Sequence, residues 1–270
     1  WKWAFYDWAN SGFATTVMAG FFPIFFKSFW AGDLEAAQST FVIGSVNSLI
    51  GLLIAISAPI LGAIADAGKT KKRFLFIFAA LGILATGYLF FIPESSWKLA
   101  VVFYGLGVIG FSGGNIFYDA LIVSVSSSNE RNRTSSLGFS LGYLGGGLLF
   151  LLNVAMYLYP HWFGLSGPAD AVLWSFLSVA IWWFIFSMPL LLYVKETSDL
   201  VEKENNNIVS TAFTNLLSTA KSVRNYKKVV IFLLAYFLYM DGVDTIIRMA
   251  TSYGSDIGLS ASSMISALLL

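Results

Sequence analysis

The sequence of 270 residues is 57% hydrophobic and 11% charged, whereas a soluble domain is usually about 25% charged. Its 16 Lys and Arg nearly balance its 15 Asp and Glu, so it lacks the basic excess by which proteins neutralise nucleic-acid phosphates, and no nucleic-acid partner is expected. Because it has no cysteine and a single histidine, His161, the chain has no disulfide, thiolate metal site or paired-histidine motif, and no metal site is expected.

The chain contains long apolar stretches, and about 20 such residues suffice for a helix to cross a bilayer. Seven spans and the start of an eighth are predicted, at residues 5–27, 40–65, 74–93, 99–125, 135–159, 172–194, 229–255 and 261–270. The first span is not typical of a cleaved signal peptide because it contains Asp7, Asn10 and Lys27. The fold class is therefore all-α integral membrane. The incomplete last span leads us to expect that the chain is a fragment.

The basic residues predict how the spans are oriented. Of the 16 Lys and Arg, 13 fall at the amino terminus or in residues 69–73, 131–133 and 195–228, which the alternating spans place on one side. Only Lys27 and Lys98 fall on the other side, and Arg248 lies within a span. By the positive-inside rule, the amino terminus and the basic loops are expected in the cytoplasm.

Residues 195–228 differ in composition from the rest, because they are polar and contain a run of Asn. They predict a cytoplasmic linker between an N-terminal six-helix bundle, 1–194, and the start of a second bundle, 229–270. Apolar residues at helical spacing within the linker predict an amphipathic helix in the membrane interface. It could pack on the bundle, sense lipids or bind a partner. These apolar residues are Val209, Phe213, Leu216, Leu217, Ala220 and Val223.

Glycines recur within the fourth and fifth spans and predict close helix contacts, because a residue without a side chain lets two backbones approach. The fourth span has Gly110 and Gly114, and the fifth repeats glycine at 138, 142 and 146. Residues 105–110 have the form GxGxxG, but this stretch lies inside an apolar span and not between a strand and a helix. We therefore interpret it as a packing surface and not as a nucleotide site.

Several stretches resemble one transporter family. In residues 62–73, Gly-x-x-x-Asp-x-Gly precedes a basic run and resembles the loop between the second and third helices of the major facilitator superfamily, although a positive-inside anchor would have the same composition. YDWANSGFATTV at 6–17, SLGFSLGYLGGG at 136–147 and YFLYMDGVDTI at 236–246 resemble the vacuole-effluxer branch of that superfamily. That branch includes the autophagy-related amino-acid effluxer of fungal vacuoles.

The resemblance implies two six-helix halves, each built from three-helix inverted repeats, with a solute site between them near mid-membrane. It implies secondary transport of a small solute, amino-acid efflux being the expected case, without a cofactor. The expected partners are the solute, the lipid bilayer and the missing C-terminal helices, or a second copy if the chain is naturally short. The expected location is the plasma (inner) membrane in a bacterium or the vacuolar membrane in a fungus.

Three ionisable residues in the seventh span are candidates for solute or proton binding, because charges at membrane depth are costly and usually functional. Asp241, Asp244 and Arg248 are spaced i, i+3 and i+7 and share one helix face. At 1.5 Å per residue from Val229, Asp241 lies roughly 18 Å into the membrane and Arg248 about 28 Å. Asp244 and Arg248 can pair. Asp241, left without a local partner, could bind a proton or the solute, hydrogen-bond between the halves, or line a wet cavity.

A second polar group is predicted near the cytoplasmic side. Asp7 and Asn10 in the first span, and Asn115 and Asp119 in the fourth, form i, i+3 and i, i+4 pairs that we expect to meet. With the basic loops they are interpreted as a cytoplasmic gate whose ion pairs form and break between states, static interface caps being the alternative. The other candidate gate residues are Gly62, Asp66, Gly68, Lys69, Arg73, Arg131 and Arg133.

Two other classes of function are compatible with parts of the sequence. Residues 110–113, Gly-Phe-Ser-Gly, have the form of an intramembrane serine-protease motif with Ser112 as nucleophile. The only histidine, His161, is expected in an outer loop, too far to act as the general base, so the chain is not expected to be an enzyme. A membrane scaffold or receptor built on a transporter fold is the remaining alternative, and the mid-membrane Asp residues argue against it.

Overall fold

The computed structural model describes residues 1–68, 70–196, 214, 218 and 221–268. Seven of its helices are long and apolar enough to cross a membrane, which confirms the seven predicted spans. The first span is a continuous run of short helices: α1 (Phe5–Gly12), η1 (Phe13–Phe21), α2 (Phe22–Phe25) and η2 (Phe26–Trp30). The others are α3 (Ala36–Gly68), α4 (Lys71–Tyr88) with η3 (Leu89–Phe91), α5 (Trp97–Ala120), α7 (Arg131–Leu158), α8 (Pro168–Tyr193) and α10 (Lys227–Asp256). The short elements α6 (Ile122–Val125), η4 (Pro160–Phe163) and α11 (Ala261–Ala267) join or follow them.

The first span is the central helix of the bundle. It is the most buried of the seven, at 61% of its apolar window, because aromatic side chains project from it in several directions. Phe13, Phe22, Phe26 and Trp30 are all fully buried. The η1 and η2 segments are π-helical, a wider winding that is frequent at functional positions and that a hydropathy pattern does not reveal.

Glycines bring the surrounding helices into backbone contact. A Cβ atom added at Gly110 of α5 would lie 2.7 Å from the Phe78 carbonyl oxygen of α4, and one at Gly146 of α7 would lie 3.0 Å from the carbonyl oxygen of Ser11 in α1. These distances confirm the predicted close packing in the fourth and fifth spans. In contrast, a Cβ atom at Gly147 would meet nothing within 4 Å.

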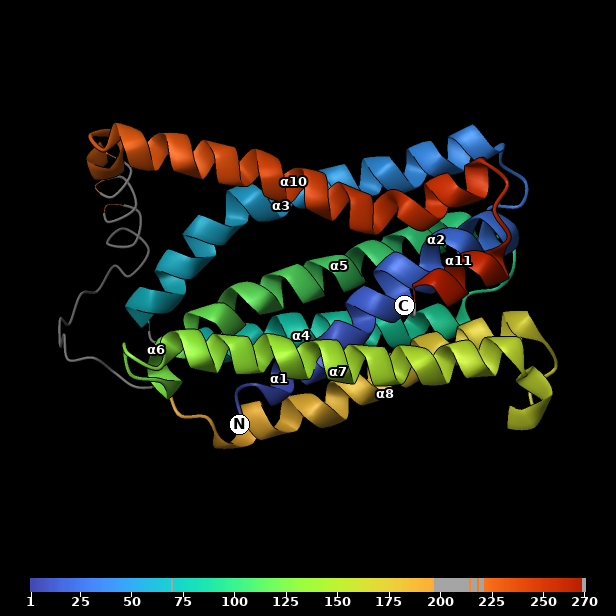
Figure 1. Cartoon of the computed structure of the whole chain (residues 1–270), viewed down its shortest axis with the longest axis horizontal. Coiled ribbons are helices and arrows are strands. Elements are labelled where there is room, and N and C mark those ends of the chain that lie inside the picture. The colour runs from blue at the N-terminus through green and yellow to red at the C-terminus, as the bar shows by residue number, and fades with distance from the viewer. Residues whose placement is uncertain (69, 197–213, 215–217, 219–220, 269–270) are drawn as a thin grey trace.

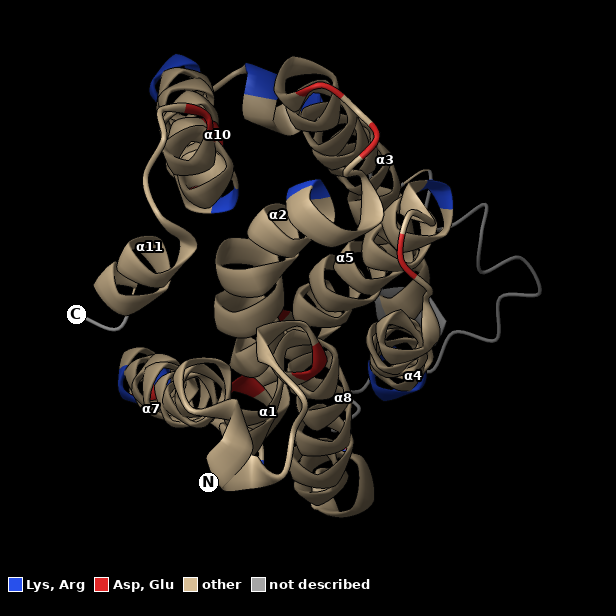
Figure 2. Ribbon diagram, turned by 90° about the vertical axis from the view of Figure 1, so that its right-hand side faces the viewer, with Lys and Arg blue, Asp and Glu red and all other residues tan. Residues whose placement is uncertain are grey.

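The helices α3 and α10 lie at the edge of the molecule, side by side (Figures 1 and 2). Only 11% of the apolar window of α3 and none of that of α10 is buried. Their exposed side chains include Phe41, Leu52, Phe232 and Leu234, a surface suited to lipid or to further helices. The α11 helix, after α10, returns towards α7 (Figure 2).

The charged residues lie mainly at the ends of the long helices and in the segments that connect them. The basic end holds the amino terminus and the loops around residues 70, 126–130 and 194–196. There, Lys2 lies over the Tyr193 ring and Lys72 Nζ donates to the Val194 carbonyl oxygen at 2.8 Å. We call the other end, with residues 31–35, 92–96 and 159–167, the opposite end. Five of the six apolar positions in the predicted linker helix, all but Val223, lie outside the described residues, and the proposed division at 194 and 229 stays a prediction.

Candidate functional site

Two predicted polar pairs lie together between α1 and α5. The Asn10 Nδ2 atom donates to the Asn115 Oδ1 atom at 2.5 Å, across 105 residues of sequence. Asp7 lies one turn before Asn10 in α1, and Asp119 lies one turn after Asn115 in α5, so the two carboxyl groups flank this amide contact. We call Asp7, Asn10, Asn115 and Asp119 the carboxylate cluster. It joins the first and fourth spans by uncharged amides and places two carboxyl groups beside them.

Small side chains and tyrosines surround the carboxylate cluster. A Cβ atom at Gly142 of α7 would lie 2.9 Å from Asp7 Cγ, so α7 can pack against Asp7 only because this position is glycine. Ser11 Oγ donates to Asp7 Oδ1 at 3.4 Å. The centroids of the Tyr6 and Tyr118 rings lie 5.2 Å apart. Hydroxyl and aromatic groups therefore surround the cluster.

Three buried oxygens around the cluster have no hydrogen-bond partner among the described residues. They are Tyr6 Oη, Tyr118 Oη and Asn10 Oδ1, in residues that are 0%, 4% and 1% exposed. An unpaired polar atom in a low-dielectric interior is costly, so such atoms usually contact water or a ligand. The tyrosines were not identified from the sequence, because aromatic residues within a span are most often lipid-facing or core residues.

The loop between the second and third spans is a short helix reversal. The helix α3 ends at Gly68 and α4 begins at Lys71. The side chain of Asp66 and all of Lys69 lie outside the described residues. A Cβ atom at Gly62 would meet nothing within 4 Å, so Gly62 makes no close helix contact with the described residues, and its participation in a gate stays a prediction. The physical reason for this open space is that α3 is an edge helix with little of its surface buried.

The candidate gate arginines do not reach the carboxylate cluster in this structure. Arg73 begins α4 and is exposed, and Arg131 and Arg133 lie exposed in the first turn of α7. Within the described part of the chain, none of the three forms an ion pair. Their participation in a gate stays a prediction.

The ionisable residues of α10 lie on one face of that helix. Arg248 Nη2 pairs with Asp244 Oδ2 at 3.7 Å, as their i, i+4 spacing predicts. The helical repeat carries the same face on to Ser252, which is buried against the first six spans. The stripe therefore faces the first six spans, yet Asp241 and Asp244 remain exposed because α10 diverges from them.

A polar contact joins α3 and α5. Tyr104 Oη donates to Asn47 Oδ1 at 3.1 Å. The Asn47 Nδ2 atom has no partner among the described residues. Asn47 and Tyr104 were not identified from the sequence, where nothing distinguishes them from other polar residues within the spans.

A contact at the opposite end joins the first six spans to α10 and was not predicted. Lys27 Nζ lies 2.6 Å from Asp256 Oδ1 and also donates to the Ser252 carbonyl oxygen at 3.0 Å. The second carboxylate oxygen of Asp256 accepts from Thr40 Oγ1 at 2.8 Å. We call this the Lys27–Asp256 contact. Lys27 is one of two cations expected on its side of the membrane. This scarcity is the feature of the sequence that could have indicated an acidic partner near the end of another span.

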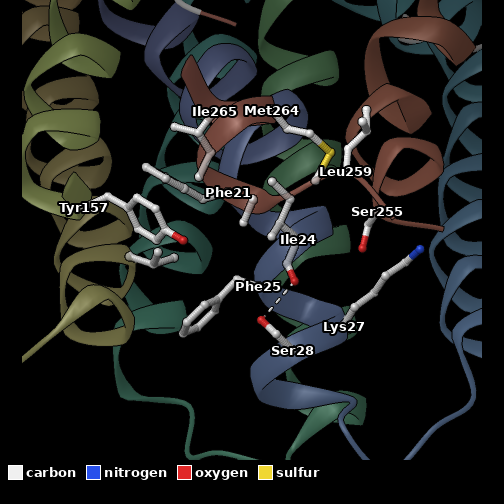
Figure 3. Close-up of a pocket in the computed structure, with 12 residues that line it drawn as sticks. Phe21, Ile24, Phe25, Lys27, Ser28, Tyr157, Ser255, Leu259, Met264 and Ile265 are labelled. Carbon is white, nitrogen blue, oxygen red and sulfur yellow. Dashed lines mark hydrogen bonds between the residues drawn. The ribbon is translucent and has the colours of Figure 1, made fainter. Parts of the chain in front are cut away.

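A cavity of about 470 Å³ borders the Lys27–Asp256 contact (Figure 3). Its walls come from α2 and η2, from Tyr157 of α7 and from the α10–α11 connection, with Leu259, Met264 and Ile265 on the apolar side. Lys27 lines the cavity but is already paired with Asp256. The cavity and the Lys27–Asp256 contact therefore belong to one junction between the first six spans and α10–α11.

The geometry does not support serine-protease chemistry. Ser112 lies inside α5, whereas His161 lies exposed in η4 at the opposite end. Among the described residues, no hydrogen bond joins the two side chains. A nucleophile needs a base within hydrogen-bond reach, and His161 is not placed to be that base.

Comparisons with known proteins agree with one another. The family described as "Vacuole effluxer Atg22 like" matches residues 34–126 and 123–270. The uncharacterized MFS-type transporter YxiO of Bacillus subtilis (strain 168) is 40% identical over 98% of this chain and 62% of its own length. Autophagy-related protein 22 of Saccharomyces cerevisiae (strain YJM789) is 24% identical over 79% of this chain and 47% of its own length.

The crystal structure of a D-xylose-proton symporter has the same fold. It superposes with a TM-score of 0.60 at 16% identity, over 99% of this chain and 64% of that one. At this identity the likeness shows the fold alone. The chain spans less than two thirds of the length of each of these three proteins.

Proposed function

Because this chain belongs to the vacuole effluxer Atg22-like family of major facilitator transporters, we propose that it moves a small solute across a membrane by alternating access. The observation that carries the proposal is the uneven contact of α10 with the first six spans. The two are joined at the opposite end by the Lys27–Asp256 contact, whereas α10 is exposed along its half nearer the basic end. Alternating access requires two parts of the protein that are in contact at one end and separated at the other.

The transported solute is proposed to be an amino acid, exported from its compartment. The proposal rests on the family and on the polar groups available inside the bundle. Asp241 is proposed to bind a proton or the cationic part of the solute, and Asp244 with Arg248 to shape the outer approach. The carboxylate cluster, together with the loop residues from Gly62 to Arg73 and with Arg131 and Arg133, is proposed to close the inner side. No cofactor is proposed beyond a coupled proton.

The proposed location follows from the relatives and from the charge asymmetry. The protein is a multi-pass membrane protein. We propose the plasma membrane if its source is bacterial and the vacuolar membrane if fungal, with the amino terminus in the cytoplasm. The remaining helices of a second half, or a second copy of the chain, are proposed to form the other wall of the solute path.

Transport by the purified protein in proteoliposomes tests the proposal. Liposomes loaded with a panel of radiolabelled amino acids are expected to release at least one of them faster than protein-free liposomes, and a pH gradient is expected to change the rate. Asp241→Asn is expected to reduce the flux more than about tenfold and to remove its pH dependence. Asp33→Asn, an exposed carboxylate at the opposite end, serves as the matched control and is expected to transport normally. Unchanged flux and pH dependence in Asp241→Asn would refute the role of Asp241.

A further inference from the structure

The carboxylate cluster contains two carboxyl groups, and neither Asp7 nor Asp119 forms an ion pair with a Lys or Arg of the described residues. Two ionised carboxylates near each other in a partly desolvated site repel strongly, and a positive charge between them relieves the repulsion. Among the described residues, no basic side chain offsets the charge that these two groups carry when ionised.

No basic group on the neighbouring helices is placed to supply that positive charge. The helices packed on α1 and α5 are α7, α8, α4 and α3. The α8 helix contains no Lys or Arg, and its charged residue, Asp170, lies in the first turn, at the opposite end. The α3 helix contains no Lys or Arg either. On α4 and α7 the basic groups lie in the first turns, at the basic end, where Lys72 Nζ is engaged by the Val194 carbonyl oxygen. They are Lys71, Lys72, Arg73, Arg131 and Arg133.

Unpaired oxygens complete the site. Asn10 Oδ1 is buried without a donor, while the amide nitrogen of the same side chain is held by Asn115. The buried hydroxyls of Tyr6 and Tyr118 also lack partners among the described residues. Two carboxylates, one amide oxygen and two hydroxyls form an all-oxygen set, which suits a hard cation or the three N–H donors of an ammonium group.

We propose that the carboxylate cluster is a binding site for a singly charged cation, either an inorganic ion or the ammonium group of a solute. The charge of the ligand follows from the number of carboxyl groups. A multivalent metal ion usually takes several acidic, imidazole or thiolate ligands, whereas the cluster has two carboxyl groups, and no group of three such side chains occurs among the described residues. Asp119 is exposed, so a ligand can reach the cluster from outside the bundle. The link of this site to transport rests on the proposed function, whereas binding itself does not.

Thermal unfolding of the full chain in detergent tests the proposal, because a ligand that binds only the folded state raises the Tm. Sodium and methylammonium are compared with choline, which lacks N–H donors, at equal ionic strength and pH. A rise of at least about 2 °C is expected for the unsubstituted protein and for the control Asp33→Asn. The rise is expected to disappear in Asp7→Asn and in Asp119→Asn.

The outcomes separate the sources of the cation. A rise with sodium alone assigns an inorganic ion, and a rise with methylammonium alone assigns an ammonium group. No rise with either cation, or a rise that persists in both cluster variants, overturns the proposal. Since Asp→Asn removes the repulsion, both variants are expected to have at least the Tm of the unsubstituted protein in choline, and a lower Tm would also contradict the proposal. A failure of solute flux in proteoliposomes leaves this binding result unaffected.

Discussion

Single glycines decide how closely the helices of this bundle approach. At Gly110 a Cβ atom would collide with the Gly82 backbone and lie 2.7 Å from the Phe78 carbonyl oxygen, both in α4. Backbone cannot rotate away as a side chain can, so a methyl group at this position must push the two helices apart. At Gly147 of α7 nothing lies within 4 Å of the same added atom.

We therefore expect Gly110→Ala to destabilise the protein by about 1–3 kcal/mol, the usual cost of overpacking a well-packed contact. Gly147→Ala is the matched control and is expected to be neutral or stabilising by up to about 1 kcal/mol, because alanine has the higher helix propensity. Thermal unfolding of both variants in the same detergent measures the difference. Equal unfolding temperatures in the two variants would show that α4 and α5 are not in backbone contact at Gly110.

The residues of the site differ in how far sequence reveals them. Spacing was enough to pair Asp7 with Asn10 and Asn115 with Asp119, because ionisable and amide residues within apolar spans stand out. The hydroxyls of Tyr6 and Tyr118 did not stand out, since tyrosine is common both at membrane interfaces and in cores. Lys27 and Asp256 are separated by 229 residues, and no local pattern reports a contact over that distance.

A polar contact with little exposure to water joins the end of α10 to the first six spans. The Lys27 and Asp256 side chains are only 10% and 28% exposed, so water competes weakly for their charges. Both carboxylate oxygens of Asp256 are engaged, one by Lys27 and the other by Thr40. Breaking this contact leaves α10 with few other polar attachments, among them the hydrogen bond from Thr251 Oγ1 to the Ala19 carbonyl oxygen at 2.9 Å.

We expect Asp256→Asn to release the end of α10. Loss of a charge-assisted hydrogen bond costs about 1.5–3 kcal/mol, so the equilibrium constant between the joined and released states should fall about 10- to 150-fold. Because the chain contains no cysteine, spin labels attached to the thiols that Asp33→Cys and Leu259→Cys introduce are free of background labelling. Pulsed electron paramagnetic resonance is expected to show a longer and broader distance distribution in Asp256→Asn.

The control for this experiment is Asp170→Asn. Asp170 lies at the same end, and among the described residues its side chain bonds only to the backbone of its own loop, where it accepts from Ser166 N. This variant is expected to leave the distance distribution unchanged. A single narrow distribution in Asp256→Asn, identical to that of the control, would mean that apolar packing and not the ion pair holds α10 in place.

At the level of elements, apolar length alone located all seven spans. The expected ends differed from the observed ones by a few residues, as in α3, which begins at Ala36 and not near residue 40. The π-helical turns in the first span could not be predicted, because they depend on how Phe13, Phe21 and their neighbours pack and not on hydropathy. The divergence of α10 could not be predicted either, because an apolar helix has the same hydropathy pattern whether it packs along its whole length or only at one end.

For the whole molecule, the two ends carry different charge. In the sequence, thirteen of the 16 Lys and Arg fall in the segments that the alternating spans predict on one side, and only Lys27 and Lys98 fall on the other side. Lys27 is paired with Asp256, and Lys98 lies over the Trp97 ring. Since short loops rich in Lys and Arg are retained in the cytoplasm, the basic end should face inward.

Cysteine accessibility tests this orientation without background labelling, because the chain has no cysteine of its own. We expect Glu94→Cys, exposed in the loop between η3 and α5, to react with a membrane-impermeant maleimide in intact cells. Asn129→Cys, exposed in the loop between α6 and α7, is expected to react only after the membrane is permeabilised. The reverse pattern would place the carboxylate cluster nearer the outer face. It would then act on the solute at the outward mouth, and the Lys27–Asp256 contact would close the cytoplasmic side.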